Sequence, residues 1–121
     1  MEAKPDVTWR IFGMYMLIIV FMLVANASRG QISVAQFNAS WNDANAVPWV
    51  MDLSDCKTIS YVDIAANPKM QVKHKIAAIP TIIIFKDNIE VARFQADLSF
   101  KMMATREEVQ EEIDNILMSD F

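Results

Sequence analysis

Apolar and polar positions divide the chain into a charge-free apolar run near the start and a longer region of alternating patterns. Residues 11–25 contain no charged side chain. Farther along, residues 32–37 alternate large apolar side chains with small or polar ones, and residues 58–64 follow a similar period of two. Both patterns predict strands. Residues 79–85 form a longer β-branched run, which is typical of a central strand covered on both faces.

Helix signals separate these predicted strands. Asn42 and Asn45 belong to a polar group that offers N-cap side chains for a helix over residues 47–53. Pro48 falls in the first turn of that helix, where proline is tolerated. The Asn67–Pro68 pair predicts the start of a second, short helix that runs to about residue 75.

The last third of the chain predicts a hairpin and a long helix. Residues 86–88 include Asp and Asn, which tolerate positive φ, so a tight turn is expected before an antiparallel strand over residues 90–95. Thr105 to Glu108 match a capping box, and apolar residues follow at helical spacing: Val109, Ile113, Ile116 and Leu117. The predicted order is therefore β-α-β-α-β-β-α around a central mixed sheet, an α/β fold.

The leader has the parts of a secretory signal. Lys4 and Arg10 precede the apolar run, and an A-x-A pattern at residues 25–27 follows it. As a helix the run would cover roughly 22 Å, less than the ~30 Å hydrocarbon core of a bilayer. We interpret residues 1–27 as a signal peptide or a membrane anchor that contacts the membrane through residues 11–27, with a helix buried in the core as the remaining alternative. The first two interpretations make the rest of the chain exported (periplasmic, lumenal or extracellular) or membrane-anchored.

Charge and cysteine content exclude several classes of protein. Eleven Lys and Arg against fifteen Asp and Glu give a net charge of −4, whereas nucleic-acid binding requires a basic surface. A single cysteine, Cys56, excludes an internal disulfide, and a single histidine, His74, excludes a Cys/His zinc cluster. We expect no nucleic-acid partner, no metal and no cofactor. His74 lies between two lysines and is expected to be a solvated helix residue.

Three segments of the chain resemble the thioredoxin superfamily. Residues 37–41 match the family's F-x-A-x-W approach to its active site, and residues 63–68 match a strand end that leads into a helix. Residues 76–88 match the family's I-x-x-x-P-T pattern and the hydrophobic strand that follows it. The resemblance covers residues 32–118. It implies a minimal thioredoxin-like fold for residues 28–121, preceded by a hydrophobic N-terminal helix.

The residues that carry redox chemistry in the family are replaced in this sequence. The two cysteines of its C-x-x-C motif align with Asn42 and Asn45, and the buried carboxylate of many relatives aligns with Gln36. A thiol at a helix N-terminus has a lowered pKa and supplies a thiolate, whereas Asn offers no ionisable nucleophile. We therefore expect no dithiol exchange and, more broadly, no enzyme activity. The two asparagines are interpreted as helix caps or as hydrogen-bonding groups for a partner.

The resemblance also implies a surface that binds without thiols. Pro80 aligns with the family's cis-proline. In relatives the backbone just before that proline, here Ile79, pairs with an extended substrate segment. Trp41 is either a packing residue of its loop or a contact residue. The candidate binding surface, the vestigial active-site face, comprises Trp41, Asn42, Asp43, Ala44, Asn45, Ile79 and Pro80.

The connection before the last helix is enlarged and apolar. It contains Leu98, Phe100, Met102 and Met103. Exposing such side chains is costly, at ~25 cal/mol per Å² of apolar surface. They are expected either to fold back onto the core or to form a second, Met-rich contact patch.

These features favour a redox-inactive thioredoxin-like module that binds or assembles with a protein or an extended peptide. Two alternatives stay open. A single-thiol oxidoreductase would use Cys56, whose thiolate is disfavoured by Asp55 and favoured by Lys57. The chain is also loosely similar to small thioredoxin-fold proteins of marine tailed phages, which would make it a virion or host-modifying accessory protein.

Overall fold

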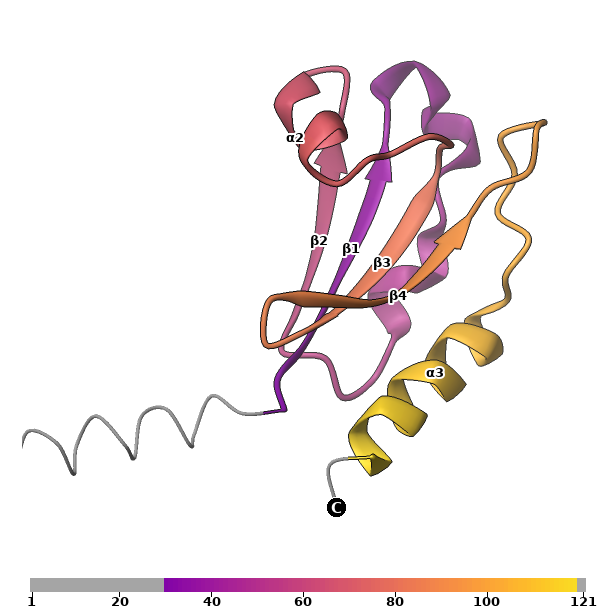
Figure 1. Ribbon diagram of the computed structural model, residues 1–121. Coiled ribbons are helices and arrows are strands. Elements are labelled where there is room, and N and C mark those ends of the chain that lie inside the picture. The colour runs from indigo at the N-terminus through magenta and orange to yellow at the C-terminus, as the bar shows by residue number, and fades with distance from the viewer. Residues whose placement is uncertain (1–29, 120–121) are drawn as a thin grey trace, which may run out of the picture.

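The computed structural model describes residues 30–119, which form a mixed four-stranded sheet (Figure 1). The strands are β1 (Ile32–Asn38), β2 (Thr58–Asp63), β3 (Thr81–Lys86) and β4 (Ile89–Gln95), in the spatial order β2-β1-β3-β4. β1 is parallel to β2 and antiparallel to β3, and β4 is antiparallel to β3. The four predicted strands and the mixed α/β sheet are confirmed.

The leader, residues 1–27, lies outside the described residues, and so do the signal peptide, anchor and N-terminal helix predicted for it. Within residues 30–119, no helix is long and apolar enough to cross a membrane.

Helical segments pack on both faces of the sheet. They are η1 (Ser40–Asn45), η2 (Pro48–Asp52), α2 (Pro68–Lys73) and α3 (Arg106–Met118), where η denotes a 3-10 helix. Ile64 and Ile76, at the two ends of the α2 segment, pack on one face of the sheet. Val50 of η2 and Val109 and Ile113 of α3 pack on the other.

The helix expected over residues 47–53 is present as the 3-10 helix η2 rather than as an α-helix, and a further 3-10 helix, η1, precedes it. Val47 separates them with an extended backbone (φ −94°, ψ 103°), and Pro48 begins η2 as expected of a first-turn proline. The Gln36 side chain bonds both the N–H and the C=O of Val47, which removes them from any helical ladder. Neither 3-10 helix has a side-chain cap, so Asn42 and Asn45 are not helix caps.

Alternation along the two central strands separates two apolar cores. Val34 of β1 and Ile82 and Ile84 of β3 face η2 and α3. Phe37 and Ile83 face the opposite side, toward the α2 segment. The three isoleucines of β3 are each 0% exposed, as the continuous β-branched run predicts for a strand covered on both faces.

The β3–β4 turn is confirmed and also fastens the start of β1. Asp87 (φ 52°) and Asn88 (φ 69°) both take left-handed backbone conformations, which suits the tight hairpin turns that favour Asp and Asn. The Asp87 carboxylate accepts hydrogen bonds from the backbone N–H of Gly30 and of Gln31, each at 3.2 Å. The hairpin and the entry to β1 are therefore held together.

α3 begins and packs as the sequence predicts. The Thr105 hydroxyl accepts from the Glu108 N–H (3.2 Å), and the Glu108 carboxylate accepts from the Thr105 N–H (3.1 Å). This completes the capping box. Val109 and Ile113 are 0% exposed, so the apolar stripe of the helix faces the sheet.

Candidate functional site

Three asparagine side chains interlock between β1 and η1. Asn38 is 0% exposed and Asn42 is 5% exposed. The Asn42 Nδ2 donates to Asn38 Oδ1 (3.0 Å), and the Asn45 Nδ2 donates to Asn42 Oδ1 (2.9 Å). The Asn38 Nδ2 donates to the Asn42 carbonyl (3.2 Å). Both polar atoms of the Asn42 side chain are thus used within the chain, and Asn42 is a buried structural amide rather than an exposed contact residue.

Gln36 fixes the chain at Val47, just after η1. Its Oε1 accepts from the Val47 N–H (2.7 Å), and its Nε2 donates to the Val47 carbonyl (3.1 Å). Gln36 is only 5% exposed. An amide supplies both a donor and an acceptor, whereas an ionised carboxylate at this position could only accept. The side chain that aligns with the family's buried acid therefore fixes the backbone here.

Trp41 points outward from this locked segment. Its side chain is 68% exposed, and its neighbours Asp43 and Ala44 are exposed as well. The indole meets the ring of Phe100 edge-on, with ring centroids 5.6 Å apart and an interplanar angle of 89°. This contact joins η1 to the loop after β4. Of the two roles left open for Trp41, its exposure favours a contact residue.

The loop after β4 is braced by Asp97. Its Oδ1 accepts hydrogen bonds from the Ser99 hydroxyl (2.6 Å), the Ser99 N–H (2.8 Å) and the Lys101 N–H (3.1 Å). These bonds, led by that of the Ser99 hydroxyl, hold the pKa of Asp97 below its usual value. Phe100 takes a left-handed backbone conformation (φ 65°), which is uncommon for an aromatic residue. The bracing therefore keeps the Phe100 ring beside Trp41.

Three of the four apolar residues of this loop are exposed. Leu98 is fully exposed, Met103 is 67% exposed and Phe100 is 43% exposed. Met102 instead packs against the core on the α3 face. Met102 therefore folds back onto the core, as one expectation had it, whereas the other three residues are left exposed, as the other expectation requires. We call the residues that remain exposed, together with their aromatic partner, the Trp41 surface: Trp41, Leu98, Phe100 and Met103.

Ile79 and Pro80 lie at the same end of the sheet. Their peptide bond is cis, as the resemblance implies. Phe37, near the end of β1, pairs with Thr81, so the start of β3 lies beside the segment that leads into η1. The Pro80 carbonyl accepts from the Ala96 N–H (3.0 Å), which draws in the loop after β4. Within residues 30–119, no backbone hydrogen bond involves Ile79.

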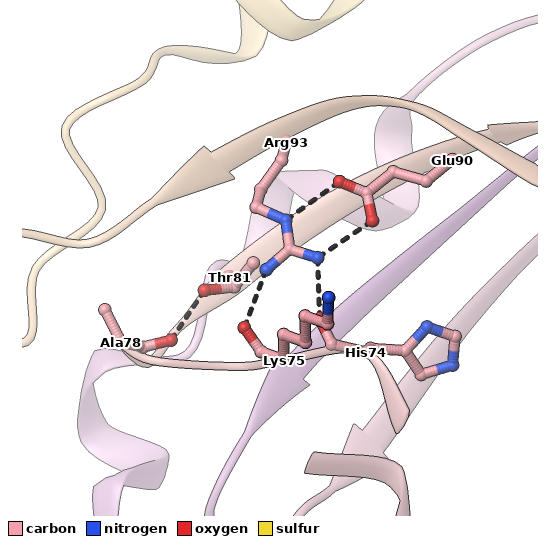
Figure 2. A network of polar contacts seen from close by, with 6 residues as sticks. All are labelled: His74, Lys75, Ala78, Thr81, Glu90 and Arg93. Carbon is pink, nitrogen blue, oxygen red and sulfur yellow. Dashed lines mark hydrogen bonds and ion pairs between the residues drawn. The ribbon is translucent and has the colours of Figure 1, made fainter. Parts of the chain in front are cut away.

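Arg93 clamps the segment that leads to Ile79 (Figure 2). Its guanidinium donates to the carbonyls of His74 (2.6 Å) and Lys75 (3.0 Å), which follow α2. It also donates to both carboxylate oxygens of Glu90 (2.9 and 2.8 Å). This pairing lowers the pKa of Glu90 and raises that of Arg93. A single side chain of β4 thus fixes the chain that enters the cis peptide.

The expectation that His74 is a solvated helix residue is wrong, because its ring packs between two aromatic rings. Its ring lies 5.1 Å from Phe37 and 5.6 Å from Phe85, measured between centroids. α2 ends at Lys73, and the turn that follows directs His74 toward the sheet. Burial and the nearby Lys73 lower the pKa of His74.

Cys56 lies far from this end of the sheet. It precedes β2, whose first residues pair with the start of β1, whereas Pro80 lies beside the end of β1. The thiol is half-buried and donates to the Ser54 carbonyl (3.4 Å). Burial, and then the negative charge of Asp55, raise its pKa. In residues 30–119, no cluster of three His, Cys, Asp or Glu side chains is placed to hold a metal ion.

Sequence reasoning missed the contacts that shape this end of the molecule. The Arg93 clamp and the Trp41–Phe100 contact join residues that are far apart in the sequence. The Asn38–Asn42 bonds are local, but no pattern in the sequence indicates them. The Glu90–Arg93 ion pair was not predictable from spacing either, because residues three apart on a regular strand point to opposite faces, and here the strand register shifts between the two residues.

The order of elements, the strand order and the cis-proline loop define a thioredoxin-like fold. Solved structures of similar fold include a point-mutant thioredoxin from Halobacterium salinarum, with a TM-score of 0.55 and 15% identity over 73% of this chain and 76% of that one. Fasciola hepatica thioredoxin aligns with a TM-score of 0.52 and 22% identity, over 78% of this chain and 89% of that one. A designed protein aligns with a TM-score of 0.55 and 20% identity, over 79% and 90%.

No protein-family profile matches the sequence, and the search of curated proteins finds no match either. At the identities of the similar structures, the likeness establishes the fold alone.

Proposed function

We propose that the chain is a redox-silent thioredoxin-like module that binds a protein partner through the Trp41 surface and the backbone edge of Ile79. The observation that carries this proposal is the exposed Trp41–Phe100 pair, at the end of the sheet where the resemblance expects a binding face. Asn42 and Asn45 stand at the positions that align with the family's thiols, and an amide cannot attack a disulfide.

The composition and bracing of the Trp41 surface support a binding role. Exposed aromatic side chains are frequent energetic anchors of protein interfaces. The Asp97 hydrogen bonds order the loop before any partner arrives. A preorganised surface loses less conformational entropy on association, so more of its contact energy appears as affinity.

Ile79 adds a mode of binding that needs no side-chain chemistry. Its backbone makes no hydrogen bond within residues 30–119, while the chain on both sides is fixed by Arg93 and by Ala96. Ile79 is only 6% exposed and its side chain belongs to the core, so pairing with an extended segment of a partner would use its backbone groups alone. The proposed partner is therefore a protein or peptide that offers an extended stretch next to apolar side chains.

The proposed cellular location is inferred from residues 1–27. The charge-free run over residues 11–25 and the A-x-A pattern support an exported or membrane-anchored protein. Cys56 gives no comparable support for single-thiol chemistry, because its raised pKa disfavours the reactive thiolate.

Selection of linear peptides on the full-length chain tests the binding proposal. Peptides that bind should lose about tenfold or more in affinity for Trp41→Ala. Met51→Ala is a matched control, since Met51 is 69% exposed on η2 and is not part of the Trp41 surface. Equal weakening by both variants, or no selectable peptide, would contradict the proposal.

An insulin-reduction assay tests the redox part separately. The full-length chain with dithiol reductant should reduce insulin no faster than the reductant alone, and Cys56→Ser should leave that rate unchanged. Turnover that disappears in Cys56→Ser would instead establish the single-thiol alternative.

A further inference from the structure

β4 is an edge strand of the sheet (Figure 1). Residues of β4 and α3 line a groove of about 600 Å³. Four consecutive residues of the strand, Val91 to Phe94, line the groove. Side chains of consecutive strand residues point to opposite faces of a sheet. A groove that touches all four therefore follows the backbone edge of β4 rather than one of its faces.

The register of β4 shows which backbone groups face this groove. The Ala96 N–H donates to the Pro80 carbonyl, so the polar groups of Ala96 point toward the start of β3. Along an antiparallel strand, alternate residues direct their N–H and C=O to opposite edges. In the observed register Phe94 and Ala92 point toward β3, which leaves the backbone groups of Arg93 and Gln95 on the outer edge.

The chain itself begins to pair with this edge and then leaves it. Ala96 forms an antiparallel bridge with Met102, next to the bond from the Asp97 N–H to the Lys101 carbonyl (2.9 Å). After Met102 the chain turns away and begins α3 at Arg106. Within residues 30–119, no strand continues this pairing along the rest of β4. The bridge sets Met103 opposite Gln95, so the uncovered part of the outer edge is the part before Gln95, which includes Arg93.

The far wall of the groove is negatively charged. Glu108, Glu111 and Glu112 line it from α3. Among the described residues, neither Glu111 nor Glu112 forms an ion pair. The guanidinium of Arg93 is bound to Glu90 and to two carbonyls, so it does not neutralise this wall.

We propose that the outer edge of β4 is a second docking site, which binds an extended polypeptide segment carrying Lys or Arg at alternate positions. The segment adds as a strand antiparallel to β4, on the part of the edge before Gln95, and pairs with the backbone of Arg93. Its alternate side chains face α3, where the three carboxylates select cations. The site is separate from the Trp41 surface and does not depend on it.

Titration of the full-length, isotope-labelled chain with a synthetic heptapeptide of alternating Lys and Val tests this site. We expect saturable changes in the amide chemical shift of Arg93, with weaker binding at higher salt. A heptapeptide of alternating Glu and Val should not bind. Absence of binding by the basic peptide, or shift changes centred on β2 or Trp41, would overturn the proposal.

Two double variants with the same change in net charge separate a specific groove from general attraction. Glu108→Gln with Glu112→Gln alters the groove wall, and Gln at position 108 preserves the capping box. Glu107→Gln with Asp114→Asn alters the same helix at residues that do not line this groove. We expect about fivefold weaker binding for the first pair only. Equal weakening by both pairs would overturn the proposal.

N-methylated peptides test the strand pairing. Methyl groups on the alternate amides that face β4 should abolish binding, whereas methyl groups on the other set should leave it intact. Equal affinity of the two methylated peptides would overturn strand addition.

Discussion

η1 and α3 are both helical segments of the same domain, yet they are held in different ways. α3 is specified by its own sequence, through a capping box at Thr105 and an apolar stripe that includes Val109 and Ile113. η1 has no side-chain cap and is fixed by hydrogen bonds between its own buried Asn42 and the buried Asn38 of β1. Buried polar side chains can therefore fix a surface segment such as η1, which has no side-chain cap of its own.

The largest expected effect lies on the α3 side of this comparison. Ile113→Ala removes a side chain that is 0% exposed and leaves a cavity. We expect the free energy of unfolding to fall by about 2–5 kcal/mol, measured by chemical denaturation. The exposed Met118→Ala on the same helix is the control, with little change expected. A loss below about 1 kcal/mol for Ile113→Ala would mean that α3 contributes little to the core.

A smaller loss is expected where amides hold η1. Asn42→Ala removes the bonds to Asn38 and from Asn45, and so leaves buried polar groups with fewer partners. The free energy of unfolding should fall by about 1–3 kcal/mol. Asn45→Ala, at a half-buried position, removes only one of these bonds and should cost less. If the order of the two losses is reversed, the interlocked amides are not what fixes η1.

The third effect concerns the start of α3. Thr105→Ala removes the hydroxyl that accepts from the Glu108 N–H and should cost about 1 kcal/mol of unfolding free energy. Thr105→Ser retains that hydroxyl and should stay close to the parent chain. Equal losses for the two variants would show that the methyl group of Thr105, rather than the cap, is responsible.

The smallest effect on stability is expected at the exposed side of η1. Trp41→Ala should change the unfolding free energy by no more than about 0.5 kcal/mol, because its side chain is mostly in solvent. The same variant is expected to weaken peptide binding strongly. A large loss of stability would instead make Trp41 a packing residue and would remove the main support for the Trp41 surface.

The elements that the sequence predicted well are those whose signals are local. The period-two strands, the Asp87–Asn88 turn and the capping box each depend on residues within a few positions of one another. The cis bond before Pro80 was expected from a family resemblance over a contiguous segment. These features needed no knowledge of distant contacts.

The helix expected over residues 47–53 has a different form, a 3-10 helix over Pro48–Asp52, and its start is held by a contact from elsewhere in the chain. Gln36, on β1, bonds both backbone groups of Val47, the residue directly before η2, and so holds η2 apart from η1. His74 was misplaced for a similar reason, since Phe37 and Phe85 on the sheet form the slot that receives its ring. One sequence contains no signal that links such positions.

The candidate site was predicted in part. Trp41, Ile79 and Pro80 were named from the resemblance, and the loop that contains Phe100 was named from its apolar content. Their meeting at one end of the sheet was not predicted, because it follows from the register of β1 and β3 and from the path of the chain after β4.

The Asp87 carboxylate grips Gly30 and Gln31 at the end of the sheet remote from Trp41. The seven residues of β1 then span roughly 23 Å before the chain reaches η1. A pulling force applied to the chain before Gly30 would act first on the β3–β4 hairpin and on β1, which are hydrogen-bonded to one another. It would not act directly on the loops around Trp41. The Trp41 surface therefore lies about the length of β1 away from the point at which the chain enters the sheet.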